Sequence, residues 1–236
     1  MELTPIERRV LGVLIEKGLT TPDQYPLTLN ALVAGCNQKS NRDLITNLDE
    51  PQVDATLQSL IGKELVGNAT GFAGRVERFS SQMGRRFELR SVEVAVIGEL
   101  LLRGPQTEGE LRIRASRMRP IADLAALTEI LVKLQATTPP FVVRLSPEGQ
   151  PRGVRYTHGL YPAAELKKLI AAEASFLPAE GEASAPRTPQ ITNGSPDESS
   201  ELRARIALLE SRVDALERRL ASQSQTPSQS QTPSQS

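Results

Sequence analysis

The only histidine and the only cysteine of this 236-residue chain limit the catalytic chemistry that it could perform. A Ser-His-Asp or Cys-His arrangement would have to use His158, which stands at the end of an expected strand beside Gly159. Cys36 has no second cysteine with which to build a thiolate metal cluster or an intramolecular disulfide. We therefore expect a structural histidine, either satisfied or facing solvent, and a cysteine buried in the core at a helix end.

Sequence motifs for binding phosphate or dinucleotides are also missing. The chain has no Gly-rich loop followed by Lys-Ser/Thr and no dinucleotide fingerprint. The acidic pairs Asp49/Glu50 and Glu108/Glu110 lie at expected helix starts, where the helix macrodipole explains them. We therefore predict a protein that is not an enzyme and that uses no cofactor and no metal.

Arginine residues suggest nucleic-acid binding instead. The overall charge is zero, but arginine outnumbers glutamate between Arg75 and Arg119, a bias milder than that of dedicated nucleic-acid-binding proteins. Guanidinium groups suit phosphate because they donate two parallel hydrogen bonds. The cations that we expect to contact the phosphates of duplex DNA are Lys39, Arg42, Arg75, Arg78, Arg85, Arg86, Arg112, Arg114, Arg117 and Arg119.

A repeated segment indicates the architecture that positions these cations. Residues 10–18 and 96–104 are similar in sequence at an offset of 86. A repeat of this length is about one small domain, so the same fold is expected twice in tandem. The offset pairs Val10 with Val96, Gly12 with Gly98, Leu14 with Leu100, Lys17 with Arg103 and Gly18 with Gly104.

Each copy is expected to hold three helices followed by a β-hairpin, which is the order of a winged helix. In the first copy, the capping box Thr4–Glu7 starts a helix over about 5–17 that Gly18 would end. The other elements expected there are helices around 27–33 and from 49 to 61, and strands 65–69 and 76–79. The second copy is expected to contain helices 91–103, 107–118 and 123–134, strands 141–145 and 154–157, and a closing helix over 162–176.

The predicted fold class is mainly α with small β-hairpins (α+β), organised as two tandem winged-helix domains and a C-terminal coiled-coil helix. The domains are expected at 1–85 and 86–176. Residues 177–200 are rich in Pro, Ser, Ala and Glu and predict a disordered linker, and residues 222–236 predict a disordered low-complexity tail.

Residues 201–221 carry a heptad pattern. Its a positions hold Ile, Val and Leu and its d positions hold leucine, which favours a parallel two-stranded coiled coil. The flanking charges would attract each other across such a dimer, although a lone amphipathic helix docked on the chain's own core is the alternative. The dimerisation residues would be Leu202, Ile206, Leu209, Val213, Leu216 and Leu220.

Residues from Met1 to about Gly159 resemble the YceH-like family of bacterial proteins of unknown function. The runs that carry the resemblance are LTPIERRVLG (3–12), YPLTLN (25–30), CNQKSNRD (36–43) and GPQTEGELR (104–112). The resemblance implies a tandem winged-helix fold with a C-terminal coiled coil and brings no established activity. Leu44 stands where the family leads us to expect a proline.

The expected third helices argue against binding in the DNA major groove. Carboxylates outnumber lysine in both, with Asp49, Glu50 and Asp54 in the first and Asp123 and Glu129 in the second. Phosphates would repel such helices, so the wings and the arginine-rich helix would have to supply the affinity. A dimeric protein-interaction adaptor without direct DNA contact is the alternative function.

The expected partners are a second copy of this chain in a parallel homodimer, duplex DNA in a regulatory role, or an unidentified protein. No signal peptide and no apolar run of about 18 residues is found in the sequence, so we expect a cytoplasmic protein without membrane contact.

Overall fold

Polar side chains start the helices of this protein at the residues expected from the sequence. The Glu7 N–H donates to Thr4 Oγ1 at 3.3 Å, and the Thr4 N–H donates to the Glu7 carboxylate at 2.8 Å. The same reciprocal capping box joins Thr107 to Glu110 at the start of the helix Glu108–Ala115. Each box satisfies backbone donors that have no partner within the helix, which fixes the helix starts locally.

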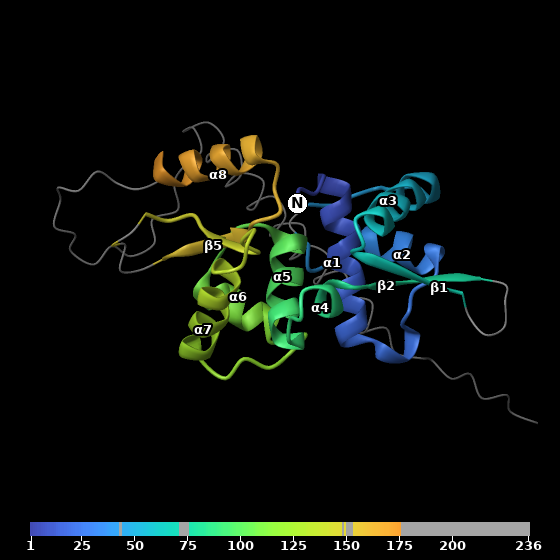
Figure 1. Ribbon diagram of the computed structural model, residues 1–236, viewed down its shortest axis with the longest axis horizontal. Helices are drawn as coiled ribbons and strands as arrows, with labels where there is room; N and C mark the ends of the chain where they lie inside the picture. Colours follow the sequence, from blue (N-terminus) through green and yellow to red (C-terminus); the bar gives the residue numbers. More distant parts are fainter. Residues whose placement is uncertain (43, 71–75, 148, 150–152, 176–236) are drawn as a thin grey trace, which may run out of the picture. The chain divides into compact units, whose positions relative to one another are not determined.

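The computed structural model describes residues 1–175 except 43, 71–75, 148 and 150–152. The described part is mainly helical with small antiparallel sheets (Figure 1). The predicted linker, coiled coil and tail, residues 177–236, lie outside the described residues. Elements of the first half are α1 (Pro5–Thr20), the 3-10 helix η1 (Pro22–Gln24), α2 (Leu29–Cys36), α3 (Glu50–Gly62), β1 (Val66–Thr70), β2 (Glu77–Ser81) and α4 (Met83–Arg86).

The second half repeats three helices and a hairpin and adds a closing helix. Its elements are α5 (Ser91–Arg103), β3 (Gln106–Thr107), α6 (Glu108–Ala115), α7 (Leu124–Gln135), β4 (Val142–Arg144), β5 (Arg155–His158) and α8 (Ala163–Ser175). The strand order is β3-β5-β4, and all pairs are antiparallel. In the first half, β1 pairs with β2, and Leu27 makes an additional bridge to Phe79. The segment before the second helix of each copy therefore pairs with the hairpin, a contact that the sequence analysis did not predict.

The two repeated helices, α1 and α5, lie side by side (Figure 1) and make the most extensive contact between helices. A Cβ at Gly12 would lie 2.8 Å from Leu102 Cγ and 3.3 Å from Leu101 Cβ, and a Cβ at Gly98 would lie 2.5 Å from Ile15 Cγ2. The offset of 86 relates Ile15 to Leu101, so the contacts are reciprocal. Glycine at both positions lets the two helix backbones approach closely.

Gly18 does not end α1 as expected, because the helix continues to Thr20. A Cβ at Gly18 would lie 3.0 Å from the Tyr25 ring, so this glycine makes room for an aromatic side chain. Its counterpart Gly104 does end α5, with a φ of 71° that favours glycine. The two glycines of the repeat therefore have different structural roles.

An ion pair between a buried glutamate and a partly exposed lysine is also repeated. Glu7 Oε1 lies 2.6 Å from Lys63 Nζ, and Glu93 Oε1 lies 2.9 Å from Lys133 Nζ. The offset of 86 relates the two glutamates. Burial alone would raise the pKa of both carboxyls, but hydrogen bonds from the lysines and from backbone N–H groups outweigh it and leave both pKa values lowered. Each pair ties the first helix of a copy to the end of its third helix.

Candidate nucleic-acid interface

The solvent face of α3 carries carboxylates. Glu50 is exposed and Asp54 is half-buried, and both line a hollow of about 500 Å³ together with Glu77 of β2. Lys63, the nearest lysine, is turned inward to its ion pair with Glu7. This face would therefore repel DNA phosphates, as the sequence predicted for the third helix of the first copy.

The solvent face of α7 carries two large apolar side chains. Leu124 is 48% exposed and Val132 is 59% exposed, at a spacing that places both on one side of the helix. Lys133 is held by Glu93, which leaves Glu129 as an exposed charge of this helix. Such a face offers few groups that could read base edges or contact phosphate.

Arg42 is not available to contact phosphate, so this part of the prediction is wrong. Its side chain is 0% exposed, and its two terminal nitrogens donate to the Glu16 carboxylate at 3.0 and 2.6 Å. A buried, doubly bonded guanidinium cannot reach a ligand on the surface without breaking this pair. Arg42 is therefore part of the core of the first half.

Two cations of the second half of the described chain bond to Asn41, which lies in a loop of the first half. Arg103 Nη2 and Arg117 Nη1 donate to Asn41 Oδ1 at 3.0 and 2.9 Å. Lys39 is exposed two residues before Asn41. We call Lys39, Arg103 and Arg117 the Asn41 cluster.

The sequence analysis did not include Arg103 and Asn41 among the candidate site residues. The repeat could have pointed to Arg103, because it pairs this residue with Lys17. Both side chains donate to the segment after α2. Lys17 Nζ lies 3.3 Å from Gln38 Oε1, and Arg103 bonds to Asn41. Next to this contact, burial raises the pKa of Glu99, which pairs with Arg103 Nε at 3.0 Å.

The other arginines of α6 and the turn after it bond mainly within the protein. Arg114 donates to Gln106 Oε1 at 2.9 Å and to Glu110 at 3.4 Å. Arg119 donates to the Leu19 carbonyl at 3.1 Å, which joins the two halves of the described chain. Arg112 makes a longer hydrogen bond of 3.4 Å to the Ala122 carbonyl. It forms no ion pair with the described residues.

Two exposed arginines of β2 and α4 have no carboxylate partner among the described residues. Arg78 donates to the Pro26 carbonyl at 2.9 Å, and Arg85 lies on α4 at the edge of a cavity of about 280 Å³. Arg86 forms an ion pair with Glu64. Arg75 lies outside the described residues.

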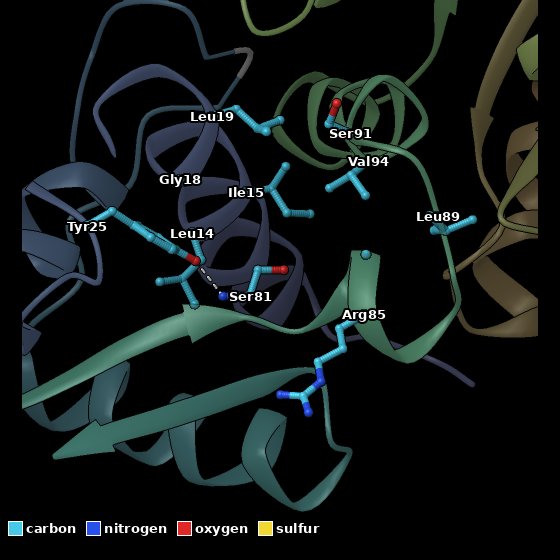
Figure 2. A pocket seen from close by; sticks show the side chains of 11 residues that line it. Leu14, Ile15, Gly18, Leu19, Tyr25, Ser81, Arg85, Leu89, Ser91 and Val94 are labelled. Atoms are coloured by element: carbon cyan, nitrogen blue, oxygen red, sulfur yellow. Dashed lines mark hydrogen bonds between the residues drawn. The ribbon is translucent and has the colours of Figure 1, made fainter. Parts of the chain in front are cut away.

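The cavity beside Arg85 is apolar and lies between α1, α4 and α5 (Figure 2). Leu14, Ile15 and Val94 line it, and the Tyr25 hydroxyl accepts a hydrogen bond from the Ser81 N–H at 2.5 Å. Figure 2 shows Arg85 pointing away from Ile15 and Val94. The polar groups at this cavity thus do not converge on a point where a reacting atom could sit.

The two residues with potential for catalysis are both buried. Cys36 is a core residue, as predicted, and burial raises the pKa of its thiol to about 12, against the opposing effect of Arg9 and Arg42. His158 is 1% exposed and accepts the Leu160 N–H, so of the two expected environments the solvent-facing one is excluded and the buried, hydrogen-bonded one is found. Among the described residues, no group of three or more His, Cys, Asp or Glu is placed to hold a metal ion.

None of the described helices is both long enough and apolar enough to cross a membrane.

A family described as "Protein of unknown function, DUF480" matches residues 3–152 of the chain.

Related proteins cover most of the chain. A UPF0502 protein of Shewanella pealeana is 42% identical over 226 residues, which is 94% of this chain and 98% of the relative. UPF0502 proteins of Aeromonas hydrophila and Geobacter sulfurreducens are 43% and 46% identical over 91% and 76% of this chain, and 98% and 80% of their own lengths. The chain belongs to the DUF480/UPF0502 family of bacterial proteins of unknown function, the YceH-like family that its sequence resembles.

Proposed function

We propose that this chain is a non-enzymatic protein of two tandem winged-helix domains that binds duplex DNA mainly through phosphate contacts. The repeated order of three helices and a hairpin supports the winged-helix assignment, as does the short segment that pairs with each hairpin. Phosphate contacts fix a protein on the duplex without reading its sequence.

The observation that carries the proposal is the Asn41 cluster. Two cations of the second half, Arg103 and Arg117, bond to a loop of the first half that also carries exposed Lys39. Arg103 is mostly buried and pairs with Glu99, whereas Lys39 and Arg117 are exposed, so these two cations of the cluster would meet phosphate. Arg78, Arg85 and Arg112 extend the set of cations available to phosphate.

The acidic face of α3 shapes the expected binding mode. Glu50 and Asp54 would lie against phosphates if α3 entered the major groove. We therefore expect α3 to face away from the duplex and the affinity to vary little with sequence. A parallel homodimer through residues 201–221 would present two such surfaces and raise the avidity for long duplexes.

A protein-interaction adaptor is the second candidate function, and the face of α7 favours it. Leu124 and Val132 are exposed on the helix that other winged helices place against DNA, where an apolar stripe suits a protein partner better than phosphate. In this case the cations would be ordinary solvated surface.

Fluorescence anisotropy of a labelled mixed-sequence duplex, titrated with the full chain at low and near-physiological salt, distinguishes the two functions. Micromolar binding that weakens steeply with salt and is similar for unrelated sequences supports phosphate contacts. Absence of binding at low salt contradicts the DNA proposal and leaves the adaptor. Binding confined to one sequence contradicts the phosphate mode.

A further inference from the structure

A second cavity, of about 360 Å³, lies where α1, the end of α5, the segment after β5 and α8 meet. Ile6, Leu101, Leu102 and Leu169 are among its apolar lining residues. Polar and charged groups from α1, the loop after α2, α5, the end of β5 and α8 also line it. An apolar cavity with a few convergent polar groups is the usual form of a site for a small organic molecule.

Arg8 already holds a carboxylate at this cavity. Its two terminal nitrogens donate to the two Glu165 oxygens at 2.9 and 2.8 Å, the bidentate geometry that guanidinium and carboxylate groups prefer. The guanidinium also lies 4.4 Å from the centre of the Tyr161 ring. The cavity therefore contains a preformed carboxylate-binding group whose present occupant belongs to the chain itself.

His158 supplies a buried donor beside Arg8. Its ring stacks on Tyr161 at 3.9 Å, and its Nδ1 accepts the Leu160 N–H at 3.2 Å. Because Nδ1 is an acceptor, the neutral ring carries its proton on Nε2, which has no hydrogen-bond partner among the described residues. Burial, reinforced by Arg8, lowers the pKa of His158 to about 3, so the ring stays neutral at physiological pH.

Arg8 is the lining group that would select an anion. Its two terminal nitrogens meet both oxygens of the Glu165 carboxylate, so a second carboxylate could be held in the same geometry. A neutral molecule of the same shape could not form this charged pair with the guanidinium and would bind less well.

We propose that this cavity binds a small carboxylate with an apolar body, which takes Arg8 from Glu165 and accepts a hydrogen bond from His158 Nε2. The inference does not depend on DNA binding. Ligand binding would also break the Arg8–Glu165 ion pair of α8, while the Arg155–Glu173 pair at 2.9 Å would remain.

The test uses ¹⁹F NMR of 4-fluorobenzoate titrated with the full-length protein, with 4-fluorobenzyl alcohol as a probe of similar shape and no charge. We expect saturable binding of the carboxylate and at least about tenfold weaker binding of the alcohol, because only the carboxylate can pair with Arg8. Equal binding of the two probes, or binding of neither, would overturn the proposal.

Two matched variants locate the site. Glu165→Gln removes the charge of the internal competitor and should tighten 4-fluorobenzoate binding severalfold. Glu173→Gln removes the other ion pair of α8, outside the cavity, and should leave the dissociation constant unchanged. If both variants change affinity equally, the carboxylate does not compete for Arg8, and the proposal is wrong.

Discussion

Gly98 of α5 faces Ile15 of α1 so closely that a Cβ at residue 98 would lie 2.5 Å from Ile15 Cγ2. The contact lies inside two helices, where glycine costs about 1 kcal/mol relative to alanine. Close packing of the two halves offsets this cost, since any side chain at residue 98 would push α1 and α5 apart.

Gly98→Ala should therefore destabilise the protein by about 1–3 kcal/mol, the usual cost of overpacking a core. Urea denaturation of the full chain measures the change. Gly109→Ala on α6 is the control, because no atom lies within 4 Å of the added Cβ, and it should be neutral or stabilising. An equal effect of the two substitutions would show that the α1–α5 contact is not tightly packed.

The buried His158 should make stability depend on pH. Its folded-state pKa of about 3 is below the ordinary value of 6.5, so the unfolded chain binds more protons between these values. The free energy of unfolding should then decrease as pH falls from about 6.5 toward 3, by up to about 1.4 kcal/mol per pH unit. Urea midpoints measured at several pH values test this.

Carboxylates also change how the free energy of unfolding depends on pH, so the measurement needs a control variant. Glu7 and Glu93 have lowered pKa values and add to the loss below about pH 4.5, whereas Glu99, with a raised pKa, acts in the opposite direction above it. His158→Asn places an amide oxygen near the position of Nδ1, where it can accept the Leu160 N–H, and it cannot titrate. The stability of the wild type minus that of His158→Asn should therefore fall as the pH decreases from 6.5 to 5. Parallel curves for the two proteins would refute the role of His158.

The thiol of Cys36 should be inert in the folded protein. Burial raises its pKa to about 12, and a thiol that is neither exposed nor ionised reacts slowly. We expect a disulfide reagent such as DTNB to modify no thiol in buffer and one in urea. Ala34→Cys, at an exposed position of the same helix, should add one thiol that reacts at once.

Charge removal should identify the cations that contact DNA. Lys39→Gln combined with Arg117→Gln should weaken binding of all duplexes alike and flatten the dependence of affinity on salt. Arg112→Ala combined with Arg114→Ala should act in the same direction but less strongly, because Arg114 is engaged with Gln106 and Glu110. Salt titrations of anisotropy give the slopes, and a loss confined to one sequence would contradict the phosphate role.

A matched control lies on α3. Glu50→Gln combined with Asp54→Asn removes two negative charges from the face that we expect to point away from DNA. Affinity should stay the same or rise slightly through the change in net charge. A marked change in sequence preference would place α3 in the groove.

Deletion of residues 201–220 should leave a folded monomer, because the heptad pattern assigns dimerisation to this segment. Sedimentation equilibrium of the full and truncated chains measures the mass. A truncated protein that still sediments as a dimer would show that the part of the chain before residue 201 associates by itself.

The helix starts could be predicted from the sequence because a capping box is local. Thr4 and Glu7 are three residues apart and determine each other's hydrogen bonds. The partners of the arginines could not be predicted in this way, since Arg42 bonds to a residue 26 positions away and Arg117 to one 76 positions away. Whether an arginine is free for phosphate depends on such long-range pairs.

The end of α1 could not be predicted from the sequence for a similar reason. A glycine after an apolar stripe commonly ends a helix, and Gly104 does so, but Gly18 meets the Tyr25 ring instead. The ring arrives from outside the helix, and no pattern within residues 5–18 reports it. For the same reason, the cavity formed by Arg8, His158 and Tyr161 had no signature in the sequence.

The reciprocal contact of α1 with α5 also bears on the origin of the chain. Contacts in which each residue meets the counterpart of its partner are those that two identical subunits make across a two-fold axis. Gly12 with Leu101 and Gly98 with Ile15 have this form. The chain thus has the form that a gene duplication would produce from an ancestral homodimer whose two subunits became one polypeptide. The two copies could then diverge, so that α3 exposes the carboxylates of Glu50 and Asp54 whereas α7 exposes Leu124 and Val132.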